Sequence, residues 1–411
     1  MSDIKEFIQQ TKNKGMVLGL DTMRTLAERL GNPQNKPKHI IHIAGTNGKG
    51  SVGAFIESAL ICSGHTVGRY TSPAVFSHLE VFRKNGKSIC EDEYNRLMET
   101  VMDTKIVPTE FEAETALAFL FVSDCDYAVI ETGLGGLEDA TNIITAPKTA
   151  VITSISLDHM HFLGDTIEEI AEQKCGIFNE STMVIAAAQT EAARRIIAQK
   201  ARRLQLSSAK KTENIRIFDS YQLFDYGAMK DITIRLMGDF QTDNAAAAIE
   251  TLLTLGINEK DIRYGLEAAQ WHGRFEIISK EPIVIIDGAH NRSAFGELKK
   301  SLIKYYPDSK FNFITGVLKD KEYNVAAELF APVAQSVYTI TPPNPRALDK
   351  AEYAEEFKRH GVNAVPIETD NLKSVLRSDC INVIFGSLSF MAQIKDIFQS
   401  YPQNHQWHER R

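Results

Sequence analysis

A glycine-rich stretch between a short apolar run and a helical pattern is the feature that most constrains the fold of this chain. His39–Ala44 has the length and apolarity of a buried strand, and Ser51–Ser63 has the pattern of a helix. The residues between them are small or carry amide and ammonium groups, and they are Gly45, Thr46, Asn47, Gly48, Lys49 and Gly50. A strand, a tight loop and a helix in this order point backbone N–H groups and the positive helix end at phosphate oxygens. The sequence therefore predicts a phosphate loop.

Two side chains in this stretch suit a nucleoside triphosphate. Lys49 can neutralise charge on the β- and γ-phosphates, and the Ser51 hydroxyl can bind a magnesium ion. The common phosphate-loop pattern has glycine where Ile43 stands and a hydroxyl residue where Gly50 stands. A glycine-rich turn without a nucleotide is the alternative, and the strand before and helix after it favour the phosphate loop.

Apolar runs and helical patterns alternate along the rest of the chain, which indicates α/β architecture with mostly parallel sheets. The predicted strands after the loop are Tyr127–Ile130, Ala150–Ile155, Met183–Ala187, Ile283–Ile286, Phe311–Thr315 and Val383–Phe385. The predicted helices include Asp21–Leu30, Glu112–Phe121 and Ile167–Glu172. We expect two domains, residues 1–278 and residues 279–411, with a frayed tail at Gln403–Arg411.

Charge and cysteine content exclude several classes of protein. The net charge of −7 argues against nucleic-acid binding through a basic surface. The five cysteines are scattered without C-x-x-C spacing, so neither a disulfide framework nor a zinc site is expected. The chain has no apolar run long enough to span a membrane and no signal core near its start. We therefore expect a cytoplasmic protein that binds neither membranes nor nucleic acid.

The form of the loop, Gly-Thr-Asn-Gly-Lys-Gly-Ser, resembles the Mur ligase superfamily and, within it, the folate branch of folylpolyglutamate and dihydrofolate synthases. Further blocks resemble that branch in the same order along nearly the whole chain. They are Leu30-Gly31-Asn32-Pro33, Thr71-Ser72-Pro73, Thr109-Glu110-Phe111-Glu112, Glu131–Gly136, Asp139-Ala140-Thr141-Asn142, Leu157-Asp158-His159, Lys174-Cys175-Gly176-Ile177-Phe178, Phe240-Gln241, Asn244-Ala245-Ala246, Gly273-Arg274-Phe275, Asp287–Asn291 and Gly386-Ser387-Leu388.

The resemblance implies a Mur-ligase-like ATPase domain that binds ATP and folate, followed by a smaller Rossmann-like domain that binds glutamate. The implied reaction is ATP-dependent ligation of L-glutamate to the carboxylate of a folate, through an acyl phosphate, with release of ADP and phosphate. Dihydropteroate is left open as a second acceptor. The family expectation for assembly is a monomer.

The resemblance also assigns a metal site. Ser51 and Glu131 would hold one magnesium ion, and His159 would help to hold a second, with manganese able to substitute. Lys174 stands where the family has a carbamylated lysine, whose carbamate is an oxygen ligand for metal. The alternatives from the residues alone are a turn-capping carboxylate for Glu131, a structural histidine at 159 and an ordinary surface lysine at 174.

The remaining expected roles follow from the same resemblance. Lys49, His159, Lys174, Arg274 and His290 are expected to act in catalysis. Nucleotide contacts beyond the phosphate loop are assigned to Asn244, Arg274 and Asp287. The expected substrate residues are Thr71, Ser72, Pro73, Phe111 and Ser387. Turn formation for Asp287 and Asn291 and helix capping for Ser387 are the alternatives.

Three departures from the family pattern lie where the acceptor's pterin end is expected, and they leave the preferred acceptor open. They are Ala74, Val81 and Leu137-Glu138.

A cell-wall ligase of the same superfamily is one rival function, and the Gly-Lys-Gly-Ser form of the loop disfavours it. A non-catalytic ATP-binding relative is another, disfavoured because the charged residues of the expected site are all present. A simple phosphate-loop kinase would leave the later blocks unexplained.

Overall fold

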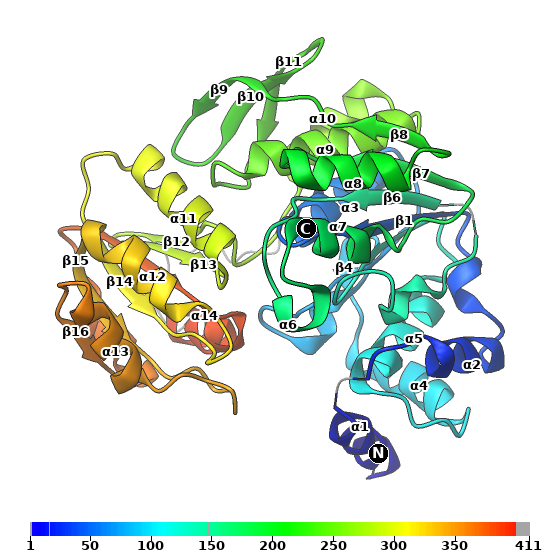
Figure 1. Cartoon of the computed structure of the whole chain (residues 1–411), viewed down its shortest axis with the longest axis horizontal. Coiled ribbons are helices and arrows are strands. Elements are labelled where there is room, and N and C mark those ends of the chain that lie inside the picture. Colours follow the sequence, from blue (N-terminus) through cyan, green and yellow to red (C-terminus); the bar gives the residue numbers. More distant parts are fainter. Residues whose placement is uncertain (1, 16, 147, 400–411) are drawn as a thin grey trace. The chain divides into compact units, whose positions relative to one another are not determined.

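A mostly parallel eight-stranded sheet carries the glycine-rich loop (Figure 1). The computed structural model describes residues 2–15, 17–146 and 148–399, so the tail expected at Gln403–Arg411 lies outside the described residues. In spatial order the strands are β4 (Lys87–Ser88), β3 (Phe82–Lys84), β2 (Val67–Tyr70), β5 (Tyr127–Glu131), β1 (His39–Ala44), β6 (Lys148–Ile152), β7 (Thr182–Ala186) and β8 (Gln205–Ser208). The six strands β2, β5, β1, β6, β7 and β8 are parallel to one another. Strand β3 pairs antiparallel with both β2 and β4. The loops that follow β1, β5 and β6 therefore meet at one edge of the sheet, where α/β proteins place their ligands.

Helices cover both faces of this sheet. They are α1 (Ser2–Asn13), α2 (Asp21–Arg29), α3 (Lys49–Cys62), α4 (Glu91–Met102), α5 (Glu110–Val122), α6 (Met160–Leu163), α7 (Ile167–Cys175), α8 (Glu191–Lys200), α9 (Gln241–Thr254) and α10 (Glu259–Ala268). Short 3-10 turns are η1 (Pro33–Asn35), η2 (His78–Val81) and η3 (Ala140–Ile143). Strands β9 (Glu213–Ile217), β10 (Gln222–Tyr226) and β11 (Met229–Ile234) form a separate antiparallel sheet, which the sequence analysis did not predict.

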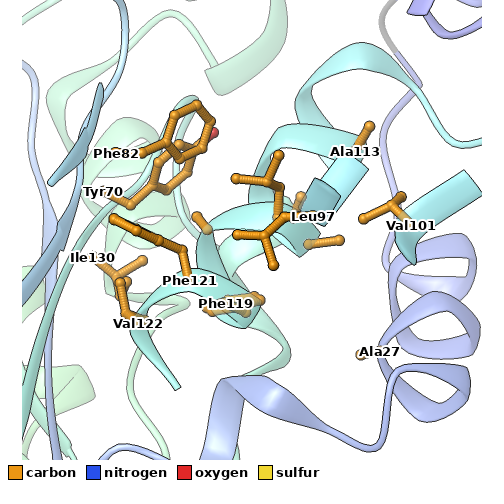
Figure 2. Packing of buried hydrophobic residues seen from close by; sticks show 14 of the residues in the cluster. Ala27, Tyr70, Phe82, Leu97, Val101, Ala113, Phe119, Phe121, Val122 and Ile130 are labelled. Carbon is orange, nitrogen blue, oxygen red and sulfur yellow. The ribbon is translucent and has the colours of Figure 1, made fainter. Parts of the chain in front are cut away.

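The two-residue period of β1 divides its side chains between the two faces of the sheet. Ile40 and Ala44 lie on the same face, where Ile40 packs in a cluster with α4 and α5 and Ala44 packs in a cluster with α7 and α8. Figure 2 shows part of the first cluster, where Tyr70 stacks on Phe82 with ring centroids 5.4 Å apart. His42 has the same parity as Ile40 and Ala44, so it faces the same helices.

Helix α3, which follows the glycine-rich loop, is almost entirely enclosed and contains a buried ion pair. Glu57 Oε2 accepts a hydrogen bond from Arg69 Nη1 of β2 at 2.8 Å, and both side chains are about 95% buried or more. Removal of one partner would leave an uncompensated buried charge, which lowers the free energy of unfolding by roughly 3–5 kcal/mol. The pairing therefore ties the helix that begins at Lys49 to the sheet beneath it.

A second unit contains a six-stranded sheet in the order β12 (Glu276–Lys280), β13 (Ile283–Asp287), β17 (Ile381–Phe385), β14 (Phe311–Thr315), β15 (Ala334–Thr339) and β16 (Ala364–Pro366). Only β12 is antiparallel to its neighbour. Its helices are α11 (Arg292–Tyr305), α12 (Tyr323–Phe330), α13 (Lys350–Arg359) and α14 (Met391–Gln399), with 3-10 turns η4 (Ala331–Val333), η5 (Thr369–Val375) and η6 (Leu388–Phe390). The expected α/β class with mostly parallel sheets is confirmed.

The two compact units do not correspond to two continuous segments of the chain. Residues 75–77 and 236–240 belong to the second unit, together with the chain from Trp271 onward. The predicted boundary after residue 278 falls inside β12, whereas the compact units divide after Gln270. Strand β12 pairs along its length with β13, so these residues belong with the sheet of the second unit.

Candidate active site

The glycine-rich loop leaves β1 and enters α3 through a glycine that no other residue replaces without strain. Gly48 has φ +88°, and a Cβ there would lie 2.3 Å from Asn244 Oδ1 of α9. The loop is also tied to the segment after β6, because the Thr46 N–H donates to Ser154 O at 2.8 Å and its hydroxyl donates to Ser156 O at 3.0 Å. The structure thus brings Asn244, predicted as a nucleotide contact, against the predicted phosphate loop.

Lys49 and Glu131 meet at the edge of the sheet. Lys49 Nζ lies 3.7 Å from Glu131 Oε1, and both side chains are largely buried. Thr71, at the end of β2, donates its hydroxyl proton to Glu131 Oε2. The carboxylate is therefore held between a cation and a hydroxyl group. Sequence reasoning named all three residues but did not predict the bond from Thr71.

Lys174 is buried, which contradicts the alternative of a surface lysine. It lies in the last turn of α7 with 4% of its surface exposed, and its Nζ donates to Gly45 O at 2.9 Å. Lys49 Nζ donates to the same carbonyl at 3.2 Å. Burial, and next the charge of Lys49, lowers the pKa of Lys174 to about 7, although Asp158 and Asp139 act in the opposite direction. This direction of the shift favours the uncharged amine, as burial of an ammonium group should.

Ser51 is held by a residue to which sequence reasoning assigned no role. Its hydroxyl oxygen accepts a hydrogen bond from Gln241 Nε2 at 3.3 Å, and Gln241 Oε1 accepts from Asn244 Nδ2 at 3.0 Å. Gln241 is fully buried at the first turn of α9. Its place in the Phe240-Gln241 block was the available signal, because a buried glutamine requires polar partners.

His159 occupies a different environment from the other expected metal ligands. It precedes α6 in the left-handed conformation, with φ +50°, and 42% of its side chain is exposed. Its neighbour Asp158 is largely buried and acts electrostatically on Lys174. Among residues 2–15, 17–146 and 148–399, no cluster of three or more His, Cys, Asp or Glu side chains has the geometry of a metal site. Oxygen donors such as Ser51 are not counted in such a cluster.

The expected acceptor residues lie near the end of β5. The ring of Phe111, at the start of α5, lies so close to Gly133 that a Cβ there would be 2.5 Å from it. A capping box fixes this helix end, because Thr109 Oγ1 accepts from Glu112 N at 3.2 Å and Glu112 Oε2 accepts from Thr109 N at 2.7 Å. Ser72 is half-buried and Pro73 is exposed, directly after Thr71.

In the second unit Asp287 organises the turn that contains Arg274. Its Oδ2 accepts from Phe275 N and its Oδ1 from Ala289 N, both at 2.7 Å. Phe275 is fully buried with φ +45°, a conformation that bulky residues rarely adopt. Burial raises the pKa of Asp287 to about 6, although the Arg274 charge opposes this. Each carboxylate oxygen already holds a backbone N–H, so turn formation is part of its role.

The other predicted residues of this unit lie at turns after parallel strands. His290 Nδ1 lies 2.8 Å from Gly288 O, in the turn after β13. Asn291 caps α11 by accepting from Ala294 N at 2.9 Å. Ser387, after β17, accepts from Ser389 N at 3.2 Å, as the helix-capping alternative predicted. The catalytic role of His290 and the substrate contact of Ser387 stay predictions.

Comparisons with known proteins extend over both units. Residues 43–252 match the family model of the Mur ligase middle domain, and residues 273–381 match that of the Mur ligase glutamate ligase domain. A Bacillus subtilis dihydrofolate synthase/folylpolyglutamate synthase is 34% identical over 96% of this chain and 98% of its own length.

Solved structures give the same result. E. coli FolC in complex with DHPP and ADP superposes with a TM-score of 0.87 at 27% identity, covering 97% of this chain and 98% of the other. Mycobacterium tuberculosis folylpolyglutamate synthase complexed with ADP and AMPPCP gives 0.85 at 28% identity, covering 94% and 96%.

The lowered pKa of Lys174 predicts a specific dependence of stability on pH. Between the folded pKa of about 7 and the unfolded value of 10.5, the unfolded chain binds the proton that the folded chain has released, so stability rises with pH. Compared with Lys174→Met, the wild type should gain roughly 2–3 kcal/mol in free energy of unfolding between pH 7 and pH 9. Urea unfolding of both proteins in buffers free of carbon dioxide measures the difference. Parallel pH profiles would contradict a buried amine with a lowered pKa.

Proposed function

The chain belongs to the Mur ligase family, in the branch of the dihydrofolate and folylpolyglutamate synthases, and from that premise we propose that it is an ATP-dependent ligase that joins L-glutamate to the carboxylate of a folate. The products are the glutamylated folate, ADP and phosphate. Dihydropteroate is proposed as a second acceptor, because the B. subtilis relative carries both names and the E. coli structure is a complex with DHPP.

The observation that carries this proposal is the convergence of three charged side chains on the glycine-rich loop. Lys49 and Lys174 both donate to Gly45 O, and Lys49 lies 3.7 Å from Glu131. Transfer of the γ-phosphoryl group to a carboxylate needs cations and metal ligands around the phosphate oxygens, and these side chains stand where they can supply them. This arrangement occurs in a chain that matches a named synthase over 96% of its length.

The donor atoms beside the loop fit a magnesium ion. Glu131 offers a buried carboxylate and Ser51 a hydroxyl at the beginning of α3, and both are the oxygen donors that magnesium prefers. We assign one ion to these two residues, and a second to His159 and a carbamylated Lys174, with manganese as a substitute. When bound, the ions would withdraw charge from the phosphate oxygens.

The chain's own residues then have defined tasks in the two chemical steps. A carboxylate oxygen of the acceptor attacks the γ-phosphorus, ADP leaves, and an acyl phosphate results; the glutamate amine next attacks the acyl carbon and phosphate leaves. Lys49 offsets charge on the phosphates, and Asn244 positions the nucleotide end of the loop. Arg274, fixed in its turn by Asp287, is assigned to charge that develops during transfer, and His290 and Ser387 to the incoming glutamate.

Lys174 has the properties that carbamylation requires. An amine with a pKa of about 7 is available as the free base, which adds to carbon dioxide with loss of one proton to give a carbamate anion. The Lys49 ammonium, which donates to the same carbonyl, would balance the new negative charge. The modification would turn the lysine that donates to Gly45 O from α7 into an oxygen ligand.

The proposal includes a monomeric, cytoplasmic enzyme with ATP, L-glutamate and a folate or dihydropteroate as its partners, and no nucleic acid or membrane. Among the described residues no helix is both long and apolar enough to cross a bilayer. A cell-wall ligase and a non-catalytic relative remain the two alternatives that experiment must separate from it.

The deciding experiment is phosphate release with ATP, magnesium and L-glutamate, with products identified by mass. Dihydropteroate, tetrahydrofolate and methylene-tetrahydrofolate serve as acceptors, and Lys49→Met is the inactive control. Turnover with dihydropteroate assigns dihydrofolate synthase activity, and turnover with a reduced folate assigns polyglutamylation. Turnover with none of these three acceptors would sink the proposal.

The phosphate loop can be tested with two glycines of similar conformation. Gly48 and Gly64 have φ +88° and +85°, but a Cβ at Gly64 meets nothing within 4 Å. Alanine at either position should cost about 1–2 kcal/mol of stability. Only Gly48→Ala, whose Cβ displaces Asn244, should weaken ADP binding, by about tenfold to a hundredfold. Calorimetric titration with ADP measures this, and equal affinities in the two variants would remove the loop from the nucleotide site.

Carbamylation is testable by carbon NMR with ¹³C-labelled bicarbonate. The wild type should show a carbamate resonance that Lys174→Gln lacks. Lys148→Gln is the matched control, because Lys148 is also buried with its pKa lowered, to about 8, but it lies at the beginning of β6, beside Ile40 and away from the glycine-rich loop. A carbamate resonance that persists in Lys174→Gln and disappears in Lys148→Gln would place the modification on Lys148 and contradict the proposal.

A further inference from the structure

A chain of buried hydrogen bonds runs beneath the candidate active site, from β1 to the loop after β5. His42 Nε2 lies 2.8 Å from Thr141 Oγ1, and Thr141 Oγ1 donates to Asp139 Oδ1 at 2.5 Å. Asp139 Oδ1 also accepts from Thr141 N at 3.0 Å, and its Oδ2 accepts from Leu134 N at 2.7 Å. The three side chains are at most 4% exposed. None of them is assigned a part in the reaction described above.

The direction of the chain is determined by its members. A hydroxyl has one proton, and Thr141 gives it to the carboxylate, so His42 must donate from Nε2. Burial, with the charge of Lys148, holds the pKa of His42 well below its usual range, so the ring is neutral and Nδ1 is bare. Among the described residues His42 Nδ1 has no hydrogen-bond partner. The ring is therefore kept in this tautomer by its bond to Thr141.

One end of the chain leads directly to the phosphate loop. His42 lies on β1, three residues before Gly45, which directly follows the strand. Its side chain points to the same face as Ala44, the face covered by α7. Gly45 O, at the end of that strand, accepts from Lys174 Nζ at 2.9 Å. A displacement of β1 along this face thus changes the position of the carbonyl to which Lys174 is bonded.

The other end leads to residues on both sides of Lys174. Leu137 N donates to Gln173 O at 2.8 Å, and Asn142 Nδ2 donates to Gly176 O at 3.0 Å. The two segments lie so close that a Cβ at Gly176 would be 2.4 Å from Leu137 Cα. The loop held by Asp139 and Thr141 is therefore in direct backbone contact with the end of α7.

The contacts close into a ring that passes from Gly45 through Lys174 and Gly176 to Asn142, Thr141 and His42, and returns along β1. We propose that Thr141 is a positioning residue for the ligase reaction, and that its hydroxyl, between His42 and Asp139, sets the place of Lys174 against the phosphate loop. The inference rests on the proposed function of Lys174 in that reaction. It predicts that loss of one hydroxyl, in a residue with no expected contact to substrate, slows the chemical step.

The test compares Thr141→Val with Thr141→Ser. Valine has nearly the same volume but interrupts the chain, whereas serine keeps the hydroxyl. Thr149→Val is the matched control, because Thr149 is also fully buried and its Oγ1 lies 2.9 Å from Nε2 of His39, at the other end of β1. This second histidine–threonine pair is equal in chemistry but remote from the loop.

Two quantities are measured for each variant: the number of ADP-binding sites and the ADP affinity by calorimetry, and kcat per binding site. Thr141→Val should keep its ADP affinity and lose about tenfold to a hundredfold in kcat per site. Thr141→Ser and Thr149→Val should retain the kcat of the wild type. A merely structural role would lower the number of binding sites and the Tm but leave kcat per site unchanged, and that result would overturn the inference.

Should Thr141→Val not fold, His42→Gln and His42→Leu answer the same question. The glutamine amide can donate to Thr141 and leucine cannot, so His42→Gln is expected to be the faster enzyme. Equal kcat per site in these two variants would also overturn the inference. A wild type that ligates no acceptor is a failure of the proposed function and is seen before any variant is made.

Discussion

The carbonyl oxygen of Gly45 is the point on which the arrangement of the candidate site depends. It ends the strand that leads into the phosphate loop, and it accepts hydrogen bonds from both Lys49 and Lys174. Burial, and next the repulsion between the two ammonium groups, lowers the pKa of Lys174, the more deeply buried of the two, to about 7. The same geometry that lowers its pKa makes the amine reactive.

Local signals were sufficient to predict the elements that position this point. The strand His39–Ala44 and the strand Phe311–Thr315 have the predicted bounds, because each is a continuous apolar run between turn residues. Helix α3 begins at Lys49, two residues before its predicted start, since Gly48 in the left-handed conformation already ends the loop. These features depend on residues adjacent in the sequence, which is why a single sequence contains them.

The parts that were not predicted depend on residues distant in the sequence. Strands β9 and β11 are an exception, because apolar side chains alternate with polar ones at Ile215 and Ile217 and at Ile232 and Ile234, and this local signal was available in the sequence. The segments 75–77 and 236–240 pack in the second unit although their neighbours belong to the first, and no local pattern encodes that exchange. The bonds from Gln241 to Ser51 and from Thr71 to Glu131 join residues 190 and 60 positions apart. Family blocks marked these residues, but only the fold gives them partners.

The two units stabilise their reactive groups by the same physical device, a buried carboxylate that accepts backbone N–H groups from the turn beside it. Asp139 holds the loop that supports Lys174, and Asp287 holds the turn of Arg274 with Phe275 in a strained conformation. In both, burial raises the pKa of the acid, so its ionised form costs stability that the surrounding N–H groups only partly offset. Hydrophobic residues at these positions would cost less, but they would leave those N–H groups without acceptors. Such an acid holds the backbone beside it in one conformation. A reaction between three bound anions requires this fixed geometry, because protein charges that are out of place would not offset the repulsion between the substrates.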